Sequence, residues 1–236
     1  MNAVLTLRDV AAGYGETVVL DHIDLSIAPG ESLAIVGRNG VGKTTLLATI
    51  MGHTALRRGR IFLHGKDIGA LKPYRRARAG VAFVPQEREI FPSLTLRENL
   101  EIAARPGPWD IAAIYRLFPR LHAREHHYGN QLSGGEQQML AIARALIGNP
   151  SLLLMDEPSE GLAPVVIEEL VGILRRLTRT DGPSLILVEQ NSALALEIAP
   201  RIAVMDRGRI VHDGASADLR RDPERLNRLI GVAERL

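Results

Sequence analysis

The sequence predicts an α/β fold with an inserted helical subdomain, and three observations indicate this class. Leu33–Val36, a glycine-rich loop and Leu46–Met51 follow one another as strand, loop and helix. Ser151–Met155 and Ser184–Val188 are short, almost wholly apolar runs, which are typical of strands buried on both faces of a parallel sheet. Residues from about 87 to 150 have mostly helical patterns, whereas both flanks are rich in predicted strands.

Composition limits the classes of protein that the chain can represent. With 236 residues, 46% of them hydrophobic and 24% charged, it has the make-up of a soluble globular protein of one or two domains. A net charge of +2 gives no indication of a nucleic-acid partner. The lack of cysteine excludes a disulfide framework and fits a reducing cytosol. We expect neither a transmembrane segment nor a signal peptide, so another chain would have to hold this one at a membrane.

The glycine-rich loop fits the phosphate-loop pattern of Gly, any four residues, Gly-Lys and then Ser or Thr. Its glycines let backbone N–H groups point at phosphate oxygens, and the following helix adds partial positive charge there. Lys43 can reach the β- and γ-phosphates, and the Thr44 hydroxyl can ligate Mg²⁺. The alternative is a glycine-rich turn without a ligand, but the flanking strand and helix favour ATP binding. The expected phosphate-binding residues are Gly37, Arg38, Asn39, Gly40, Val41, Gly42, Lys43, Thr44 and Thr45.

The chain before this loop predicts two strands, Val4–Val10 and Val18–Ile27, joined through a turn at Gly13–Gly15. Tyr14 in the turn has two interpretations. Its ring either packs beside the turn or is exposed and stacks on a nucleotide base.

The chain after the loop predicts a buried strand at Val81–Val84 that ends at Pro85-Gln86. Gln86 is either a surface residue or a residue that points into a site, because ligands of α/β sheets gather at strand C-termini. The pair His126-His127 has no second ligand cluster nearby and is interpreted as part of a polar loop. The remaining predicted elements are a strand at Gly59–Gly65 and helices at Tyr74–Ala79, Thr95–Ala104, Trp109–Leu121 (interrupted by Pro119) and Gln137–Ile147.

A glycine pair stands directly before the last of these helices. Ser133 and Glu136 have the spacing of a capping box, which is a sufficient structural reason for both residues. It does not explain Gly134 and Gly135, which suggest that backbone approaches an anion at the helix N-terminus.

Two acidic residues, Asp156 and Glu157, follow the apolar strand Ser151–Met155. At the tip of a core strand in a phosphate-loop protein, Asp156 is placed to assist Mg²⁺. Glu157 can orient and deprotonate a water molecule for attack on the γ-phosphate. Adjacent acidic residues on a loop are often only solvated, but the buried strand before them favours the functional interpretation.

The last part of the chain predicts alternating helices and strands. The strand Ser184–Val188 ends at Glu189-Gln190-Asn191. The other elements are helices at Val165–Leu177 and Ser192–Ile198, a hairpin of Arg201–Asp206 and Arg209–Asp213, and a charged helical tail from Ser216.

In this order, the motifs resemble those of the ATP-binding subunit of ABC transporters, from about Val4 to Val232. The resemblance implies a single domain, 1–236, with a P-loop NTPase core (about 1–86 and 151–236), an N-terminal antiparallel β subdomain and a helical subdomain (about 87–150). The matching motifs are the phosphate loop at 37–44, the Q-loop at Gln86, the LSGGE signature at Leu132–Glu136, Walker B at Leu152–Glu157, the D-loop at Ser159–Leu162 and an adenine-stacking aromatic at Tyr14.

The resemblance also implies a mechanism that needs two such subunits, paired head to tail around two ATP molecules. Each ATP would lie on one subunit's phosphate loop under the other's signature, and closure would drive transmembrane subunits. By the same resemblance Thr44 and Gln86 ligate Mg²⁺, Asp156 supports it and Glu157 is the general base. The signature residues that cap ATP in trans are Ser133, Gly134, Gly135 and Glu136.

Two positions depart from the wider family. Gln190 replaces a His that touches the γ-phosphate, so its amide can donate a hydrogen bond but cannot become charged. Ala163 stands where many members have Asp. With these departures, the sequence resembles the second ATP-binding subunit of branched-chain amino-acid importers. Urea and short-amide importers are close relatives of that subfamily. The segments that carry this likeness are Glu189–Asn191, Ser159–Pro164, Glu89–Pro92 and Gln137–Ile142.

The resulting expectation is an importer ATPase at the cytoplasmic face of the membrane. Its partners would be a second ATP-binding subunit, more often a different one than a copy, two permease subunits and, indirectly, a periplasmic solute-binding protein. A soluble ABC ATPase acting on nucleic acid or the ribosome is disfavoured by the single module and the small net charge. A module that binds ATP without hydrolysing it is disfavoured by Glu157 but kept open by Gln190.

Overall fold

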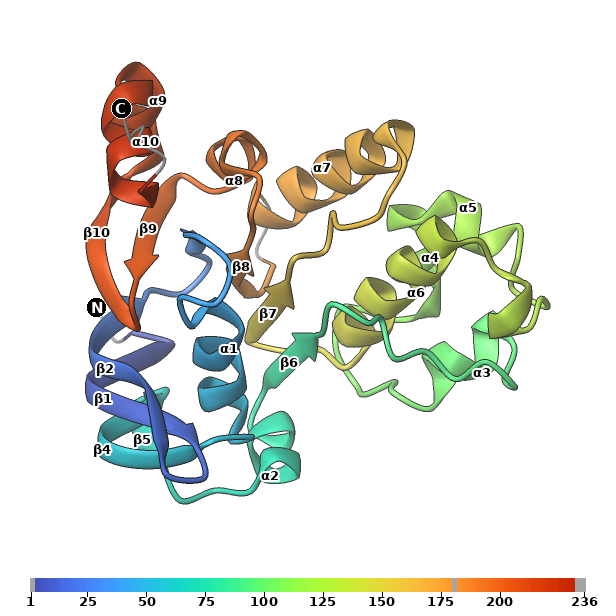
Figure 1. Ribbon diagram of the computed structural model, residues 1–236. Helices are drawn as coiled ribbons and strands as arrows, with labels where there is room; N and C mark the ends of the chain where they lie inside the picture. Colours follow the sequence, from blue (N-terminus) through green and yellow to red (C-terminus); the bar gives the residue numbers. More distant parts are fainter. Residues whose placement is uncertain (1–2, 180–181, 232–236) are drawn as a thin grey trace.

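The computed structural model describes residues 3–179 and 182–231 (Figure 1). Its larger sheet has the strand order β10-β9-β3-β8-β7-β6, and all neighbours from β9 to β6 are parallel. The strands of this sheet are β3 (Ser32–Val36), β6 (Val81–Val84), β7 (Leu152–Asp156), β8 (Ser184–Val188), β9 (Arg201–Asp206) and β10 (Arg209–Ala215). The parallel strands predicted from apolar runs are therefore confirmed.

A second, antiparallel sheet has the order β2-β1-β4-β5 and comes mainly from the N-terminal part of the chain. Its strands are β1 (Leu5–Tyr14), β2 (Thr17–Ile27), β4 (Ala55–Leu63) and β5 (Lys66–Asp67). The turn predicted at Gly13–Gly15 is wrong, because Tyr14 still pairs with Thr17 and only residues 15–16 form the turn. β4 likewise begins before Gly59, because its first residues pair with the far half of β1.

Helices surround the larger sheet, and α3 to α6 lie together beside the core as the helical subdomain (Figure 1). Asp110 caps α4 through a 2.7 Å bond from Ala113 N, and Pro119 starts a separate helix, so the predicted Trp109–Leu121 segment is two helices. Among the described residues, no helix has both the length and the apolar character needed to cross a bilayer. The helices are α1 (Lys43–Met51), α2 (Pro73–Arg78), α3 (Leu96–Glu101), α4 (Ile111–Leu117), α5 (Pro119–His122), α6 (Gly134–Ile147), α7 (Pro164–Arg179), α8 (Ser192–Ile198), α9 (Ser216–Arg221) and α10 (Pro223–Ile230).

Alternating residues of the parallel strands pack into two different layers. Leu152 and Leu154 of β7 join the core between the parallel sheet, α1 and the antiparallel sheet. Leu153 and Met155 point the other way and pack against α6 and α7. A strand covered on both faces cannot shift its register without exposing one set, so the position of its tip at Asp156 is well fixed.

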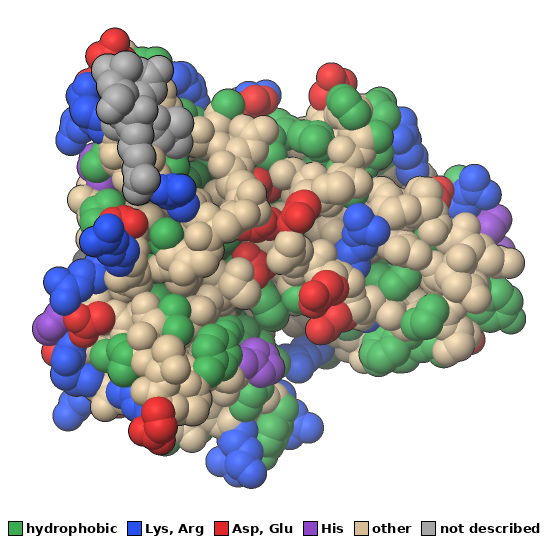
Figure 2. Space-filling model, in the orientation of Figure 1, with side chains coloured by type: hydrophobic (Ala, Val, Ile, Leu, Met, Phe, Trp, Pro, Cys, Tyr) green, Lys and Arg blue, Asp and Glu red, His purple; other side chains and the backbone are tan. Residues whose placement is uncertain are grey.

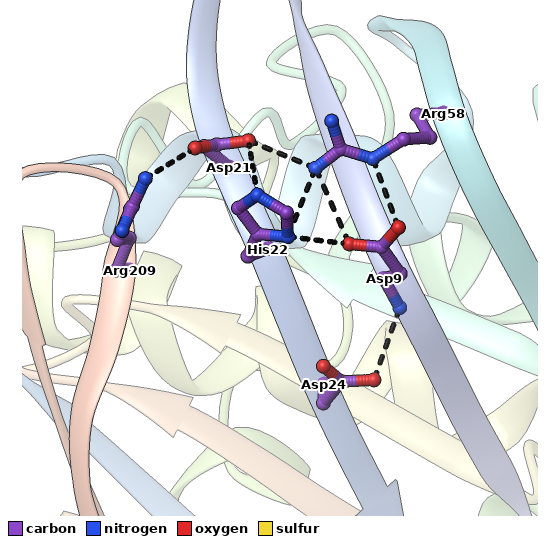
Figure 3. A network of polar contacts seen from close by, with 6 residues as sticks. All are labelled: Asp9, Asp21, His22, Asp24, Arg58 and Arg209. Carbon is purple, nitrogen blue, oxygen red and sulfur yellow. Dashed lines mark hydrogen bonds and ion pairs between the residues drawn. The ribbon is translucent and has the colours of Figure 1, made fainter.

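A polar network on the surface joins the antiparallel sheet to the β9–β10 hairpin (Figure 3). Arg209 on β10 donates to Asp21 on β2 at 2.6 Å, and this bond is the largest of the causes that hold the pKa of Asp21 below its ordinary value. At the hairpin turn, Gly208 N donates to Val41 O at 2.9 Å, which ties the hairpin to the phosphate loop. The network consists of Asp9, Asp21, His22, Asp24, Arg58 and Arg209.

Arg76 is the buried connection between α2 and the end of α1. Only 3% of the residue is exposed, and its Nη1 donates to Thr49 O and Ile50 O, both at 2.8 Å. Its other nitrogens donate to Leu71 O at 2.9 Å and Gly69 O at 2.8 Å. A guanidinium cation at a helix C-terminus satisfies unpaired carbonyls and opposes the negative end of the helix dipole. Burial lowers the pKa of Arg76, but guanidinium groups remain protonated in proteins.

We predict that Arg76→Ala lowers the free energy of unfolding by about 3 kcal/mol, because it leaves buried carbonyls unpaired. The matched control is Arg75→Ala, one position away and on the exposed side of α2, with an expected change within about 0.5 kcal/mol. Urea denaturation measures both. Equal midpoints for the two variants would contradict the assignment of Arg76 to the core.

Candidate nucleotide-binding site

The phosphate loop connects β3 to α1 and has the curled path that its glycines predict. Gly40 and Gly42 have φ angles of 79° and 108°, in the left-handed region that favours glycine. A Cβ at Gly42 would lie 3.0 Å from the Cδ2 of Leu20, so the loop also packs tightly there. The start of α1 has neither a side-chain cap nor an acidic residue in its first turn. Its N-terminal N–H groups are therefore left for an anion.

Lys43 lies inside this loop, with only 4% of the residue exposed. Its Nζ donates to Gly37 O at 2.9 Å and Arg38 O at 3.2 Å. The same nitrogen is 3.5 Å from Glu157 Oε1 at the tip of β7. The predicted cation and the predicted base thus meet at one point, although 114 positions, 157 − 43, separate them in the chain.

Asp156 is the last residue of β7 and is 2% exposed. Burial raises the pKa of its carboxyl group, and a hydrogen bond with the Thr44 side chain opposes that rise. Its Oδ1 is buried and, within the described part of the chain, has no hydrogen-bond partner. An unpaired carboxylate oxygen beside a hydroxyl is the kind of oxygen donor set that Mg²⁺ prefers.

Glu157 adopts a strained backbone conformation with a φ of 46°, which is unusual for a residue other than glycine. Its N–H donates to Val188 O at 2.9 Å, so the strand β8 holds it in this conformation. Gln190 Nε2 donates to Glu157 Oε2 at 2.6 Å. The two predicted catalytic side chains therefore face each other across the ends of β7 and β8.

Sequence analysis did not identify Glu189, which is 2% exposed at the end of β8. Its carboxylate accepts hydrogen bonds from Ser159 N at 3.3 Å and Ser159 Oγ at 3.0 Å. Burial raises its pKa to about 7. The available signal was an acidic residue directly after an apolar strand, the same signal that singled out Asp156. Figure 2 shows Asp and Glu side chains gathered near the middle of the face, above the ends of β7 and β8.

Two other predicted site residues lie at the edge of this cluster. Gln86 is exposed, and its side-chain N–H donates to the Glu160 carboxylate rather than to Thr44 or Asp156. Tyr14 is 49% exposed at the end of β1, opposite Thr17. Two residues beyond Thr17, the side chain of Val19 lies beside Gly42, so β2 passes the phosphate loop close to the strand end that carries Tyr14.

The signature residues lie apart from the other predicted site residues, at the start of α6 in the helical subdomain (Figure 1). The predicted capping box is confirmed: Ser133 N and Oγ donate to Glu136 Oε2 at 2.8 Å, and Glu136 N donates back to Ser133 Oγ at 3.3 Å. Burial raises the pKa of Glu136, but these bonds and Arg124 outweigh it, so the pKa lies below its ordinary value.

Contacts within the chain also bear on why glycine occupies positions 134 and 135. A Cβ at Gly134 would lie 2.9 Å from Arg88 Nη1, and one at Gly135 would lie 2.9 Å from Val166 Cγ1. Close packing against α7 therefore accounts for part of the glycine requirement at Gly135, whereas the Arg88 guanidinium beside Gly134 is a flexible tip that can move aside.

A groove of about 420 Å³ lies between the core and the helical subdomain. Met51 at the end of α1 and Phe83 on β6 line one side, and Ala141 and Arg144 on α6 line the other. Ile102, which follows α3, is 62% exposed at this groove. The groove thus joins the two parts of the molecule that contain the phosphate loop and the signature.

A family model described as ABC transporter matches residues 20–160, which is more than half of the chain. The chain belongs to the ABC transporter family. Within it, the chain is an ATP-binding cassette with ATPase activity coupled to transport. The match spans the phosphate loop, the signature and the acidic tip of β7, and it confirms the family expected from these motifs.

Relatives within the family are similar over most of the chain. The high-affinity branched-chain amino acid transport ATP-binding protein BraG of Pseudomonas aeruginosa is 37% identical, over 97% of this chain and 100% of that protein. A probable branched-chain amino acid transport ATP-binding protein, LivF of Archaeoglobus fulgidus, is 37% identical over 88% and 90% of the two chains. The sulfate/thiosulfate import ATP-binding protein CysA of Mycobacterium bovis is 39% identical over 93% of this chain but only 63% of that protein.

Solved structures of cassettes share the fold. The ADP conformation of an ATP-binding cassette of an ABC transporter matches with a TM-score of 0.81 at 24% identity, over 99% of this chain and all of that chain. A dimeric cassette in a post-hydrolysis state, bound to ADP and Pi, matches with a TM-score of 0.78 at 27% identity, over 90% and 98% of the two chains.

We predict that Asp156→Asn stabilises the nucleotide-free protein at neutral pH while weakening Mg-ATP binding. Because burial raises the pKa of Asp156, ionisation costs more in the folded than in the unfolded chain once the pH exceeds the ordinary value of 3.8. The uncharged amide avoids that cost, so the melting temperature should rise by a few degrees at neutral pH, with a smaller gain as the pH falls toward 3.8.

Thermal melts with and without Mg-ATP measure both effects. The nucleotide should raise the melting temperature of the wild type by more than that of Asp156→Asn, because at a fixed ligand concentration a tighter-binding ligand stabilises the folded state more. An unchanged melting temperature at neutral pH, together with an undiminished Mg-ATP effect, would contradict this account of Asp156.

Proposed function

We propose that this chain is the ATP-binding and hydrolysing subunit of an importer for branched-chain or other hydrophobic amino acids. The observation that carries the proposal is the end-to-end similarity to BraG, which spans 97% of this chain and all of that protein. The sulfate importer relative extends well beyond the length of this chain and is a weaker guide to the solute. Urea and short-amide importers remain the nearest alternative, because the ATPase does not touch the solute.

The ATP site is built on the phosphate loop. The backbone N–H groups of residues 37–45 and the start of α1 would receive the phosphates, and Lys43 would exchange its contacts with Gly37 O and Arg38 O for phosphate oxygens. The exposed ring of Tyr14 would stack on the adenine.

A magnesium ion fits the oxygen donors at the tip of β7. Thr44 and the unpaired Oδ1 of Asp156 would hold it, and Gln86 would join them after leaving Glu160. When bound, the ion neutralises charge that develops on the phosphate oxygens during transfer.

Glu157 is the proposed general base for the attacking water. Lys43 Nζ lies 3.5 Å from Glu157 Oε1, which places a cation beside the carboxylate that would accept the proton. Gln190 holds the other carboxylate oxygen through its amide, without taking on charge itself. Turnover would then need no protonation change at position 190.

The site is completed by a second ATP-binding subunit. Ser133 and its neighbours are presented at the exposed start of α6 and do not join the Lys43–Glu157 cluster of their own chain. Head-to-tail pairing would bring Ser133, Gly134, Gly135 and Glu136 to the partner's nucleotide, and a cassette of similar fold is known as a dimer bound to ADP and Pi. We propose a heterodimer in the transporter.

The membrane subunits would dock at the groove between the core and the helical subdomain. Residues from both parts of the molecule line this groove. A rotation of residues 87–150 against the core, about 1–86 and 151–236, would therefore change its shape. The exposed Ile102 gives the groove an apolar contact for a partner. We therefore place the chain at the cytoplasmic face of the membrane, bound to two permease subunits and served by a periplasmic solute-binding protein.

We predict that Glu157→Gln binds ATP with near-normal affinity but hydrolyses it at least about 100-fold more slowly, because an amide cannot accept the proton from water. Dimers should accumulate in ATP and be visible by size-exclusion chromatography. As a comparison, Gln190→Ala removes a hydrogen-bond donor and leaves the base in place, so a smaller loss of turnover is expected. Near-normal turnover in Glu157→Gln would exclude Glu157 as the base.

The amino-acid assignment is tested by reconstituting the chain with the permeases, second ATPase and binding protein encoded beside it. Import of leucine, isoleucine or valine should depend on ATP and cease with Glu157→Gln. Urea, short amides and sulfate serve as competing solutes. Import of one of these without import of any hydrophobic amino acid would overturn the solute assignment and leave the ATPase assignment intact.

A further inference from the structure

The mechanism above leaves one buried acidic residue of the site without a role. Glu189 is 2% exposed, although the loop that it contacts is only half-buried. A buried carboxylate is costly unless several hydrogen bonds compensate it. Here two of the compensating bonds come from one residue, because Ser159 N and Ser159 Oγ donate to the two separate oxygens of Glu189, and a backbone hydrogen bond from Asn191 adds to them.

Glu189 and Gln190 are neighbours, yet they hold different parts of the same loop. Gln190 contacts the side chain of Glu157, whereas Glu189 contacts Ser159, two residues further on. The backbone at this point is itself anchored, because Glu189 N donates to Ile35 O of β3 at 3.1 Å. The end of β8 is therefore a fixed support from which both contacts are made.

The contacts continue from Ser159 toward the helical subdomain. The next residue, Glu160, accepts a hydrogen bond from Gln86, which follows the edge strand β6. A connected path thus runs from Glu189 through Ser159 and Glu160 to Gln86. This path joins the end of β8, beside the proposed base Glu157, to the segment after β6. The chain enters the helical subdomain through that segment.

We propose that Glu189 is a positioning residue for ATP hydrolysis, which fixes Ser159 and thereby orients the loop that carries Glu157 and Glu160. The proposal rests on the ATPase role of Glu157 given above. The strained φ of 46° at Glu157 needs support from both sides of the residue, and Glu189 supplies it on the C-terminal side.

This role makes a distinctive prediction, because it requires the shape of the side chain but not its charge. Glu189→Gln keeps a carbonyl oxygen for Ser159 N–H and an amide that can donate to Ser159 Oγ. Glu189→Ala removes both contacts. ATP hydrolysis by the alanine variant should fall about tenfold in kcat with KM for ATP within about twofold, whereas the glutamine variant should keep at least about half of the wild-type kcat.

Ser159→Ala provides an independent arm, since it removes only the hydroxyl contact. Its kcat should fall less than that of Glu189→Ala, and the double variant should be no slower than Glu189→Ala alone, because both changes act on one interaction. Melting temperatures and nucleotide binding of all variants identify any that fail to fold. Should Glu189→Ala be such a variant, the glutamine and Ser159→Ala arms still decide the question.

Three results would overturn the proposal: an unchanged kcat in Glu189→Ala, equal loss in the glutamine and alanine variants, or a raised KM at constant kcat. These are distinct from failure of the proposed function. Absence of ATP hydrolysis in the wild-type complex would remove the general-base assignment, and absence of amino-acid import with intact hydrolysis would remove only the solute.

Discussion

The structure depends on a buried ion pair at the tips of parallel strands. Lys43 at the start of α1 and Glu157 directly after β7 are almost fully buried, and their charged groups lie 3.5 Å apart. The two-layered core holds both elements in place. Two charges withdrawn from water are costly, and here each lies beside an opposite charge that offsets part of that cost. At 3.5 Å, the Lys43 ammonium and the Glu157 carboxylate are further apart than in a close hydrogen bond. A phosphate group could therefore compete with the carboxylate for the ammonium. The site is thus stable without nucleotide and remains available to it.

The three buried carboxylates of the site differ in the partners that offset the cost of burying them. Glu157 has a cation and an amide donor beside it, whereas Asp156 has one unpaired oxygen and Glu189 has only Ser159 and backbone donors. Burial accordingly raises the pKa values of Asp156 and Glu189. In the roles proposed above, the unpaired oxygen of Asp156 would bind an external cation, and Glu189 would support the loop that contains Ser159. Three acidic residues within one small region therefore suit three different tasks.

Patterns of a few neighbouring residues predicted most of the fold and the core of the site. The apolar runs before Asp156 and Glu189 specified inner parallel strands, and the spacing from Gly37 to Thr44 specified the curled loop, because both depend on local chemistry. The sequence did not reveal Glu189 as a site residue, since its importance lies in a contact with Ser159 across two strand ends. Gln86 is a different case. Its place after a predicted strand could be read from the sequence, but its hydrogen bond to Glu160 could not, because tertiary packing brings these two residues together. The turn at Gly13–Gly15 was misplaced because strand pairing overrode the local preference of glycine.

The position of the signature is the structural basis for the proposal that the catalytic site needs a second chain. Ser133 caps α6, and Gly134 and Gly135 lie close to Arg88 and Val166, so contacts within the chain position this segment. In the proposed dimer, the exposed N-terminus of α6 would receive the phosphates of a nucleotide bound to the other subunit. The cluster around Lys43 would supply hydrogen-bond donors to only one side of a bound nucleotide's phosphates. In the proposed arrangement, the helical subdomain of the same chain supplies none to the other side. Because Gln86 and Glu160 lie between these two regions, movement of the helical subdomain would alter the loop of Glu157 directly. Dimer closure and the alignment of the base would then be one structural event, which is the coupling that a transport ATPase requires.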